Sequence, residues 1–121
     1  MSKTIALRSA AKAKLDSVCQ NVYYDQAPAS ASFPYLVFSI SELSTDDAVT
    51  LCELEVNALD YGSNTSMCES IADTVQSTLD FYVCENPVFE TYKERRHPVQ
   101  EEDKKTIRRR MTFTLRLHEG G

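Results

Sequence analysis

The sequence predicts an α+β fold of two layers, in which two helices pack on one face of a mainly antiparallel sheet of four to five strands. Two segments carry apolar residues at every third or fourth position, as on one face of a helix, and two others alternate apolar and polar residues, as in a half-buried strand. The chain also ends in two β-prone arms around a charged turn, which indicate a long C-terminal β-hairpin. Helices set against a sheet of this kind are typical of α+β proteins.

The composition fits one ordinary folded domain, so we expect a single domain over residues 1–121. Hydrophobic residues make up 42% of the chain and charged residues 26%, with 3 Gly, 4 Pro and no Trp, a balance typical of a chain that buries a core. The N-terminus lacks the continuous apolar run of a signal peptide, and no stretch of about 18 apolar residues indicates a membrane span. These features predict a cytoplasmic protein without a membrane segment.

The four cysteines are expected to be free thiols. They form no C-x-x-C pair and no zinc-type spacing with histidine, and a reducing compartment argues against disulfides. We expect them to behave as small buried or half-buried hydrophobes. They are Cys19, Cys52, Cys68 and Cys84.

The first half of the chain predicts one helix and two strands. A helix is expected from Leu7 to Val22, because its apolar positions are spaced by four, four, three and four residues. A short strand near Val22–Asp25 and a longer strand at Tyr35–Ile40 follow, separated by a loop that contains Pro28 and Pro34. The polar, acidic residues 41–49 are expected to form a turn or an exposed loop.

A strand and a second helix are predicted next. Residues 51–61 alternate, so one face is buried while Glu53 and Glu55 lie on the exposed face. Gly62 ends this strand, and a helix begins within two residues of Thr65. Ser66 and Glu69 have capping-box spacing there, although Asn64 or Thr65 also qualifies as the cap. The expected apolar stripe of this helix is Met67, Ile71, Val75, Leu79 and Tyr82.

The C-terminal hairpin has a clear second arm over Ile107–His118, where apolar and polar residues alternate. Its first arm, Val88–Val99, is less regular because Pro98 restricts its outer end. Residues 100–105 at the tip are charged or amide residues and predict a solvated loop. The alternation places Arg109 on the apolar face, where its charged head must reach solvent or find a partner.

The charge of the chain is unevenly distributed. Residues 1–92 contain 4 Lys/Arg and 13 Asp/Glu, whereas residues 93–121 contain 9 Lys/Arg and 5 Asp/Glu. Nucleic-acid binders usually show a broad basic face and a high pI, but the pI of this chain is about 5.0 and acidic residues interrupt the basic run. Direct binding of DNA or RNA is therefore not expected.

The outward-facing arginines of the second arm, Arg108, Arg110 and Arg116, allow two interpretations. In the first interpretation, they contact an acidic surface of an identical subunit, since complementary charge favours head-to-tail association that can close into a ring. Alternatively, they pair with carboxylates of neighbouring strands within one molecule, where each exposed pair contributes only about 0–1 kcal/mol.

The sequence shows no motif for catalysis, a cofactor or a metal. It contains no P-loop, GxGxxG, HExxH, GxSxG or EF-hand loop. His97 and His118 are expected to be solvated. Glu53 and Glu55, about 7 Å apart on one strand face, could serve acid/base chemistry or a hard cation, but an ordinary solvated strand face explains them better. We therefore expect a binding or assembly protein rather than an enzyme.

Three stretches, taken in order, resemble the small tail-terminator or tail-completion proteins of long-tailed bacteriophages and prophages. They are "FPYLVFSISE", "ELEVNALDYGSNTSMCESIADTVQSTL" and "EEDKKTIRRRMTFTLRL", within a likeness that covers roughly residues 15–118. The order and length of the pattern carry the resemblance. The four cysteines match nothing expected of that family.

The resemblance implies a structural virion protein that forms a sixfold ring on the last ring of the tail tube, stops polymerisation and supplies the surface for the head connector. The implied partners are identical subunits, the tail-tube protein and the head–tail connector protein, with assembly in the host cytoplasm and a final place at the head-proximal end of the tail. Its candidate contact regions are the hairpin Phe89–Arg110 and the acidic strand face. The candidate interface residues are Glu53, Glu55, Arg95, Arg96, Arg108, Arg110 and Arg116.

Two alternatives remain open on the sequence. A head-completion or neck subunit would bind the ring on the portal side instead of the tube. A small ligand-binding regulatory α+β domain would form a dimer through its sheet and contain a closed apolar pocket.

Overall fold

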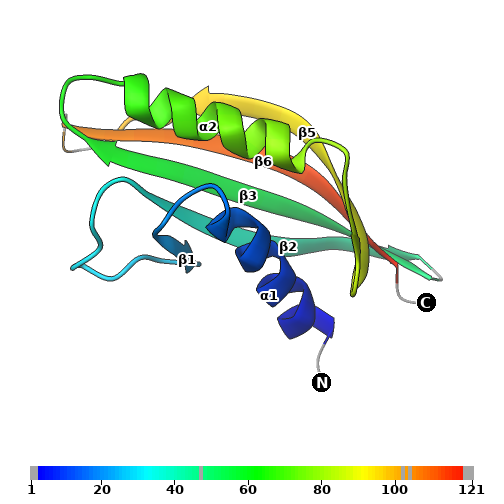
Figure 1. Ribbon diagram of the computed structural model, residues 1–121. Coiled ribbons are helices and arrows are strands. Elements are labelled where there is room, and N and C mark those ends of the chain that lie inside the picture. Colours follow the sequence, from blue (N-terminus) through cyan, green and yellow to red (C-terminus); the bar gives the residue numbers. More distant parts are fainter. Residues whose placement is uncertain (1–2, 47, 102, 104, 119–121) are drawn as a thin grey trace.

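The computed structural model describes residues 3–46, 48–101, 103 and 105–118. Two helices lie on the same face of one curled sheet, so the expected two-layer α+β arrangement is confirmed (Figure 1). The elements in chain order are α1 (Lys3–Asp16), β1 (Val22–Tyr24), β2 (Tyr35–Asp46), β3 (Val49–Tyr61), α2 (Ser66–Leu79), β4 (Tyr82–Glu85), β5 (Val88–Pro98) and β6 (Thr106–His118).

The sheet is mixed and has six strands, in the order β1-β2-β3-β6-β5-β4. β1 runs parallel to β2, whereas the other neighbouring strands are antiparallel. This corrects the expected four to five strands, because β4 was not predicted. Strand periodicity shows which residues share a face, but it does not show the direction of a strand or its neighbour.

β2 is longer than predicted and corrects the loop expected at residues 41–49. It continues to Asp46 and forms a hairpin with β3, interrupted by a bulge between Glu42 and Ser44. Its residues 41–46 are all exposed, so neither face of this end is buried. Apolar alternation, the signal of a half-buried strand, is therefore missing here.

The first helix also differs from its predicted bounds. α1 begins at Lys3 and ends at Asp16, so Val18 follows the helix and Val22 belongs to β1. Leu7, Ala11 and Leu15 are buried as expected. Val18 and Val22 still pack in or against the core, which explains why their spacing resembles that of the helix.

The second helix begins where predicted, with Thr65 as its N-cap. The capping box is not formed: Thr65 makes no capping bond through its side chain, and Oδ1 of Asn64 instead accepts a 2.9 Å hydrogen bond from the backbone N–H of Ser66. Met67 is 57% exposed, which corrects its place on the expected stripe. The buried residues of α2 are Cys68, Ala72, Val75 and Leu79.

Two turns at the ends of elements depend on unusual backbone angles. Gly62 follows β3 with φ of +127°, a conformation that favours glycine, and its N–H donates a 2.7 Å hydrogen bond to the carbonyl of Lys105. Phe81 has φ of +57° and turns the chain from α2 into β4. This turn places Tyr82 in β4, although its spacing had suggested the helix.

The core lies between the helices and the sheet and forms one cluster. α1 packs on β1, while α2 packs on β3, β5 and β6. Residues such as Phe38, Phe89 and Phe113 are at most 1% exposed. All four cysteines are free thiols, as predicted, with three buried and Cys84 half-buried.

Candidate functional site

The two faces of β6 carry different charges. One face points to the helices and includes the buried Met111 and Phe113, while the other, which we call the open face, has no helix over it among the described residues. Arg109 contacts α2 and therefore lies on the helix face, whereas Arg108 and Arg110 lie on the open face. The predicted alternation is therefore confirmed.

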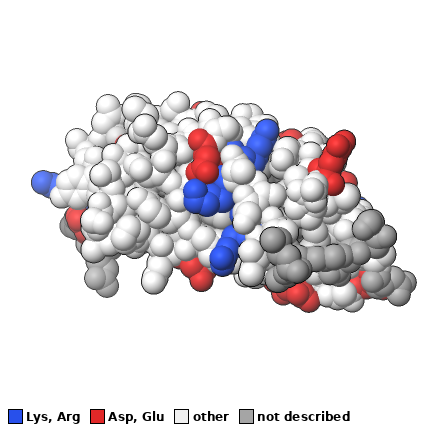
Figure 2. All heavy atoms as spheres, turned by 60° about the horizontal axis from the view of Figure 1, so that its bottom comes forward, with Lys and Arg blue, Asp and Glu red and all other residues white. Residues whose placement is uncertain are grey.

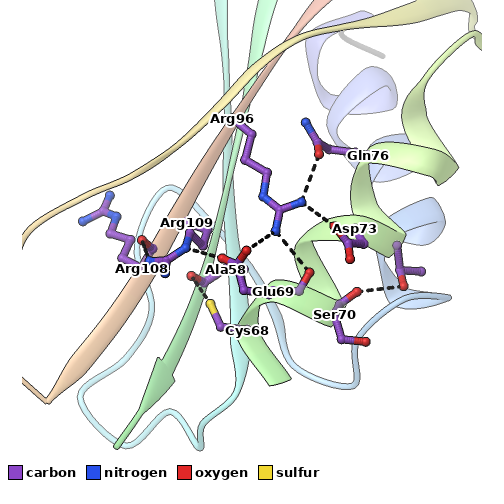
Figure 3. Close-up of polar contacts among 10 residues, drawn as sticks. Ala58, Cys68, Glu69, Ser70, Asp73, Gln76, Arg96, Arg108 and Arg109 are labelled. Carbon is purple, nitrogen blue, oxygen red and sulfur yellow. Dashed lines mark hydrogen bonds and ion pairs between the residues drawn. The ribbon is translucent and has the colours of Figure 1, made fainter. Parts of the chain in front are cut away.

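Arg109 and Arg96 both reach α2 from the helix face. Nε of Arg109 donates to Oε1 of Glu69, and Nη2 of Arg96 forms a 2.8 Å ion pair with Oε2 of the same carboxylate. Nη1 of Arg96 also lies 2.5 Å from Asp73 and 3.2 Å from the amide oxygen of Gln76 (Figure 3). The expectation that Arg109 needs a specific partner is thus confirmed.

The two arginines that make these contacts are partly buried. The side chains of Arg96 and Arg109 are 18% and 20% exposed. Burial opposes the charge of Arg96, but the hydrogen-bonded carboxylates of Asp73 and Glu69 outweigh it and raise the pKa of the guanidinium. Arg96 therefore stays charged, and the ion pairs of both arginines hold α2 on the hairpin.

On the open face, Asn57 of β3 is the centre of a polar network. Its Oδ1 accepts hydrogen bonds from Nε of Arg108 at 2.9 Å and from Nε of Arg110 at 3.3 Å. Its Nδ2 donates to Glu55 at 3.0 Å, and Glu55 lies 3.6 Å from Arg110. Arg108 also forms a 2.9 Å ion pair with Glu101.

Asn57 is only 3% exposed, so its amide is satisfied by protein groups rather than by bulk water. The sequence marked it only as one polar position of an alternating strand. No sequence signal identifies it as the link between two arginines, because that role requires β3 and β6 to be neighbours.

The remaining candidate residues of the open face are less tightly held. Arg116 lies 3.5 Å from Glu90, which also lies 3.3 Å from Nε2 of His118. Nε of Arg95 donates to the hydroxyl of Thr112 at 3.2 Å. These groups give the β5–β6 hairpin ion pairs and hydrogen bonds between its two arms.

Two of the sequence predictions need adjustment here. His118 is not simply solvated, because it contacts Glu90, and His97 is half-buried opposite Arg110 in the strand register. Glu53 is half-buried and lies opposite Ser41 on one side and Thr114 on the other.

The acidic strand and the basic hairpin are therefore neighbours in one sheet. All three outward-facing arginines have carboxylate partners within one molecule: Arg110 pairs with Glu55 of the acidic strand, Arg108 with Glu101 at the hairpin tip and Arg116 with Glu90 of β5. Arg96 is committed to α2 and points away from the open face. Contact of the other candidate residues with a second subunit stays a prediction.

A second surface, which the sequence analysis missed, consists of aromatic side chains. The ring centroids of Phe33 lie 5.2 Å from Tyr35 and 5.6 Å from Tyr61, and Tyr23 lies 5.9 Å from Tyr35. Phe33 is 42% and Tyr61 is 50% exposed. Aromatic groups of this kind are common in protein interfaces. The sequence showed aromatic strands, but not that these four rings come together.

Within the residues that the structure describes, no group of three or more His, Cys, Asp or Glu side chains is placed to hold a metal ion. Neither described helix has the length and apolar character needed to cross a bilayer. A hollow of about 360 Å³ near the hairpin tip includes Glu101, Asp103, Arg108 and Arg109 in its lining. Its charged lining differs from the closed apolar pocket expected of a ligand-binding regulatory domain.

Neither family models nor curated protein sequences match this chain. Solved structures do match its fold. A chain from the virion of a native gene transfer agent particle superposes with a TM-score of 0.74 at 14% identity, covering 95% of this chain and 96% of that one. A second solved chain matches with a TM-score of 0.74 at 13% identity, over 98% and 97% of the two chains. The shared property is the fold over almost the whole length.

Proposed function

We propose that this protein is a non-enzymatic structural component of a phage-like virion, which caps the tail tube as a ring. In this role it ends tube polymerisation and offers the surface for head–tail joining. The observation that carries the proposal is the full-length fold similarity to a chain of a gene transfer agent virion, together with the sequence resemblance to tail terminators. No cofactor or metal is part of the role.

The open face of the β5–β6 hairpin is the surface that we assign to contact with the tube or a neighbouring subunit. Arg95 is exposed and Arg116 is 47% exposed at the side chain, so both are available to a partner. The intramolecular bonds of Arg108 and Arg110 to Asn57 limit their movement. A partner would therefore meet a preformed polar surface, which lowers the ordering cost of binding.

The test is a tube-length assay with tail-tube subunits from the same phage or prophage. Purified protein is added to polymerising tubes, and tube lengths and end structures are measured by negative-stain electron microscopy. The expected result is a ring of identical subunits at one end and arrested growth. Binding to the head–tail connector without any effect on tubes would favour the neck-subunit alternative instead.

A matched pair of variants tests the assigned surface. We expect Arg95→Glu with Arg116→Glu to abolish capping while the protein remains folded, because neither arginine belongs to the Asn57 network. The control is Lys93→Glu, an equivalent change on β5 at a position opposite Phe113, on the helix side of the sheet. If the double variant capped tubes as well as Lys93→Glu does, the open face would not be the contact surface.

A further inference from the structure

A groove runs beside the free edge of β1. One side of β1 pairs with β2, and the described chain provides no strand on its other side. The groove has a volume of about 460 Å³. It is lined by Arg8, Ser9 and Lys12 of α1 and by Val22, Tyr23 and Tyr24 of β1. An unpaired strand edge presents backbone donors and acceptors to which a further strand can bind.

The groove is basic, although most of the chain is not. All Lys and Arg of the first 92 residues lie at or before Lys14. The guanidinium of Arg8 lies 4.6 Å from the ring centre of Tyr24, and Lys12 forms an exposed ion pair with Asp16. Figure 2, seen from the side of α1, shows basic side chains near the middle of this face, with acidic side chains beside them.

The outer end of β2 is acidic and, among the described strands, has an unpaired edge, so it complements the basic groove. β1 pairs only with Leu36–Phe38, so the described chain leaves the outer edge of β2 without a strand beyond that point. Residues 41–46 are exposed, include Glu42 and Asp46, and contain no basic residue. The bulge beside Glu42 leaves Leu43 58% exposed. This end is an extended, acidic segment with an apolar side chain.

β1 lies at the left of Figure 1 and the β2–β3 turn at the right. Residues 41–46 continue the strand that already pairs with the other edge of β1, so they cannot also pair with its free edge in the same molecule, but the same residues of a second copy can. Contacts of this heterologous type repeat from copy to copy and close into a ring when the rotation permits.

We propose that the acidic end of β2, residues 41–46, docks in the α1–β1 groove of a second copy of this chain. The segment extends the sheet at β1, with Glu42 and Asp46 near Arg8 and Lys12 and Leu43 against the apolar wall of the groove. Opposite charges across such a contact select the register and the partner. This inference deepens the proposed function, since it names the surfaces that join subunits in the ring.

The test is sedimentation velocity over a concentration series at low and high salt. We expect self-association of the wild-type chain that weakens at high salt. Lys12→Glu should weaken association at least about tenfold, as charge reversal at a contact does. Lys105→Glu, which changes an exposed lysine far from the groove, is the matched control and should associate like the wild type.

A charge exchange separates a lost contact from a damaged fold. Glu42→Lys with Asp46→Lys should also fail to associate alone, but its mixture with Lys12→Glu should form complexes, because one copy of each restores opposite charges. A wild-type chain that stays monomeric up to millimolar concentration, or a Lys12→Glu protein that associates normally, overturns the inference. If a variant that lacks this contact still caps tubes, the inference is wrong and the proposed function stands. If the wild-type chain associates through this contact but does not cap tubes, only the proposed function is wrong.

Discussion

Neighbouring arginines on the two faces of β6 meet different environments. On the helix face, Arg109 shares the carboxylate of Glu69 with Arg96, between the sheet and α2. On the open face, Arg108 and Arg110 share the amide oxygen of Asn57 and pair with the half-buried carboxylates of Glu101 and Glu55. The helix-face contacts bind two layers together, whereas the open-face contacts join strands that the backbone already joins.

This difference shows that a run of three arginines is not one functional patch. Because successive side chains of a strand point to opposite faces, the run is divided between a structural role and a surface role. The hairpin arginines are paired partly within the sheet and partly with α2. The basic side chains with the weaker intramolecular partners are those of α1 and, on the hairpin, Arg95 and Arg116.

The largest expected difference between the faces concerns their apolar contacts. Phe113→Ala should lower the free energy of unfolding by about 3–5 kcal/mol, because it removes a fully buried ring from the core. Thr114→Ala, the next residue on the open face, should cost about 1 kcal/mol or less. Urea denaturation measures the free energy of unfolding of both variants. Similar losses would show that the two faces do not differ in their apolar contacts.

The shared carboxylate tests the polar contacts. Glu69→Gln should lower the free energy of unfolding by about 1–3 kcal/mol, because Arg109 loses its carboxylate and Arg96 loses one of its two ion pairs. Glu101→Gln removes the ion pair of Arg108 but leaves its hydrogen bond to Asn57, so it should cost only about 0–1 kcal/mol. Hydrogen exchange should also speed up in the first turns of α2 only for the first variant. Equal effects would mean that solvent screens both sites alike.

The helix–sheet interface can be probed by pH. Cys68 is fully buried on α2 and donates to the carbonyl of Ala58, and burial raises the pKa of its thiol above 9.0. The unfolded chain then loses this proton first as pH rises, so stability falls above pH 9.0 by up to about 1.4 kcal/mol per pH unit. Cys68→Ala should flatten this slope, as measured by urea denaturation at several pH values. If the fall of stability with pH were the same in Cys68→Ala, other titrating groups would be its cause.

The smallest effect is expected at Arg116. Its ion pair with Glu90 spans 3.5 Å, and its side chain is 47% exposed. Arg116→Gln should change the free energy of unfolding by about 0.5 kcal/mol or less. A loss above 1.4 kcal/mol, a factor of about ten in the folding equilibrium, would show that the open face contributes to stability as much as the helix face does.

Several features follow from the sequence without knowledge of the fold. The alternation of β6, the start of α2 near Thr65 and the need of Arg109 for a partner were all predictable. They depend on residues close in sequence, whose positions follow from the 2.0- and 3.6-residue periods. The two layers follow as well, because amphipathic helices and half-buried strands must cover each other.

Other features depend on which segments become neighbours. The bulge between Lys93 and Arg95 breaks the alternation of β5, so only the structure places Arg96 opposite Met111 on the helix face and Arg95 opposite Thr112. Asn57 acquires its role because β3 lies beside β6. The exposed end of β2 and the short β4 carry too little apolar pattern to predict.

The sequence by itself therefore determined the elements with a buried face and the uneven charge of the chain. Only the tertiary structure decided that Glu55 and Asn57 of β3 meet arginines of β6, and that Arg8 and Lys12 lie beside the free edge of β1. The physical reason is that periodicity is local, whereas charge pairing and strand order depend on contacts between residues distant in sequence.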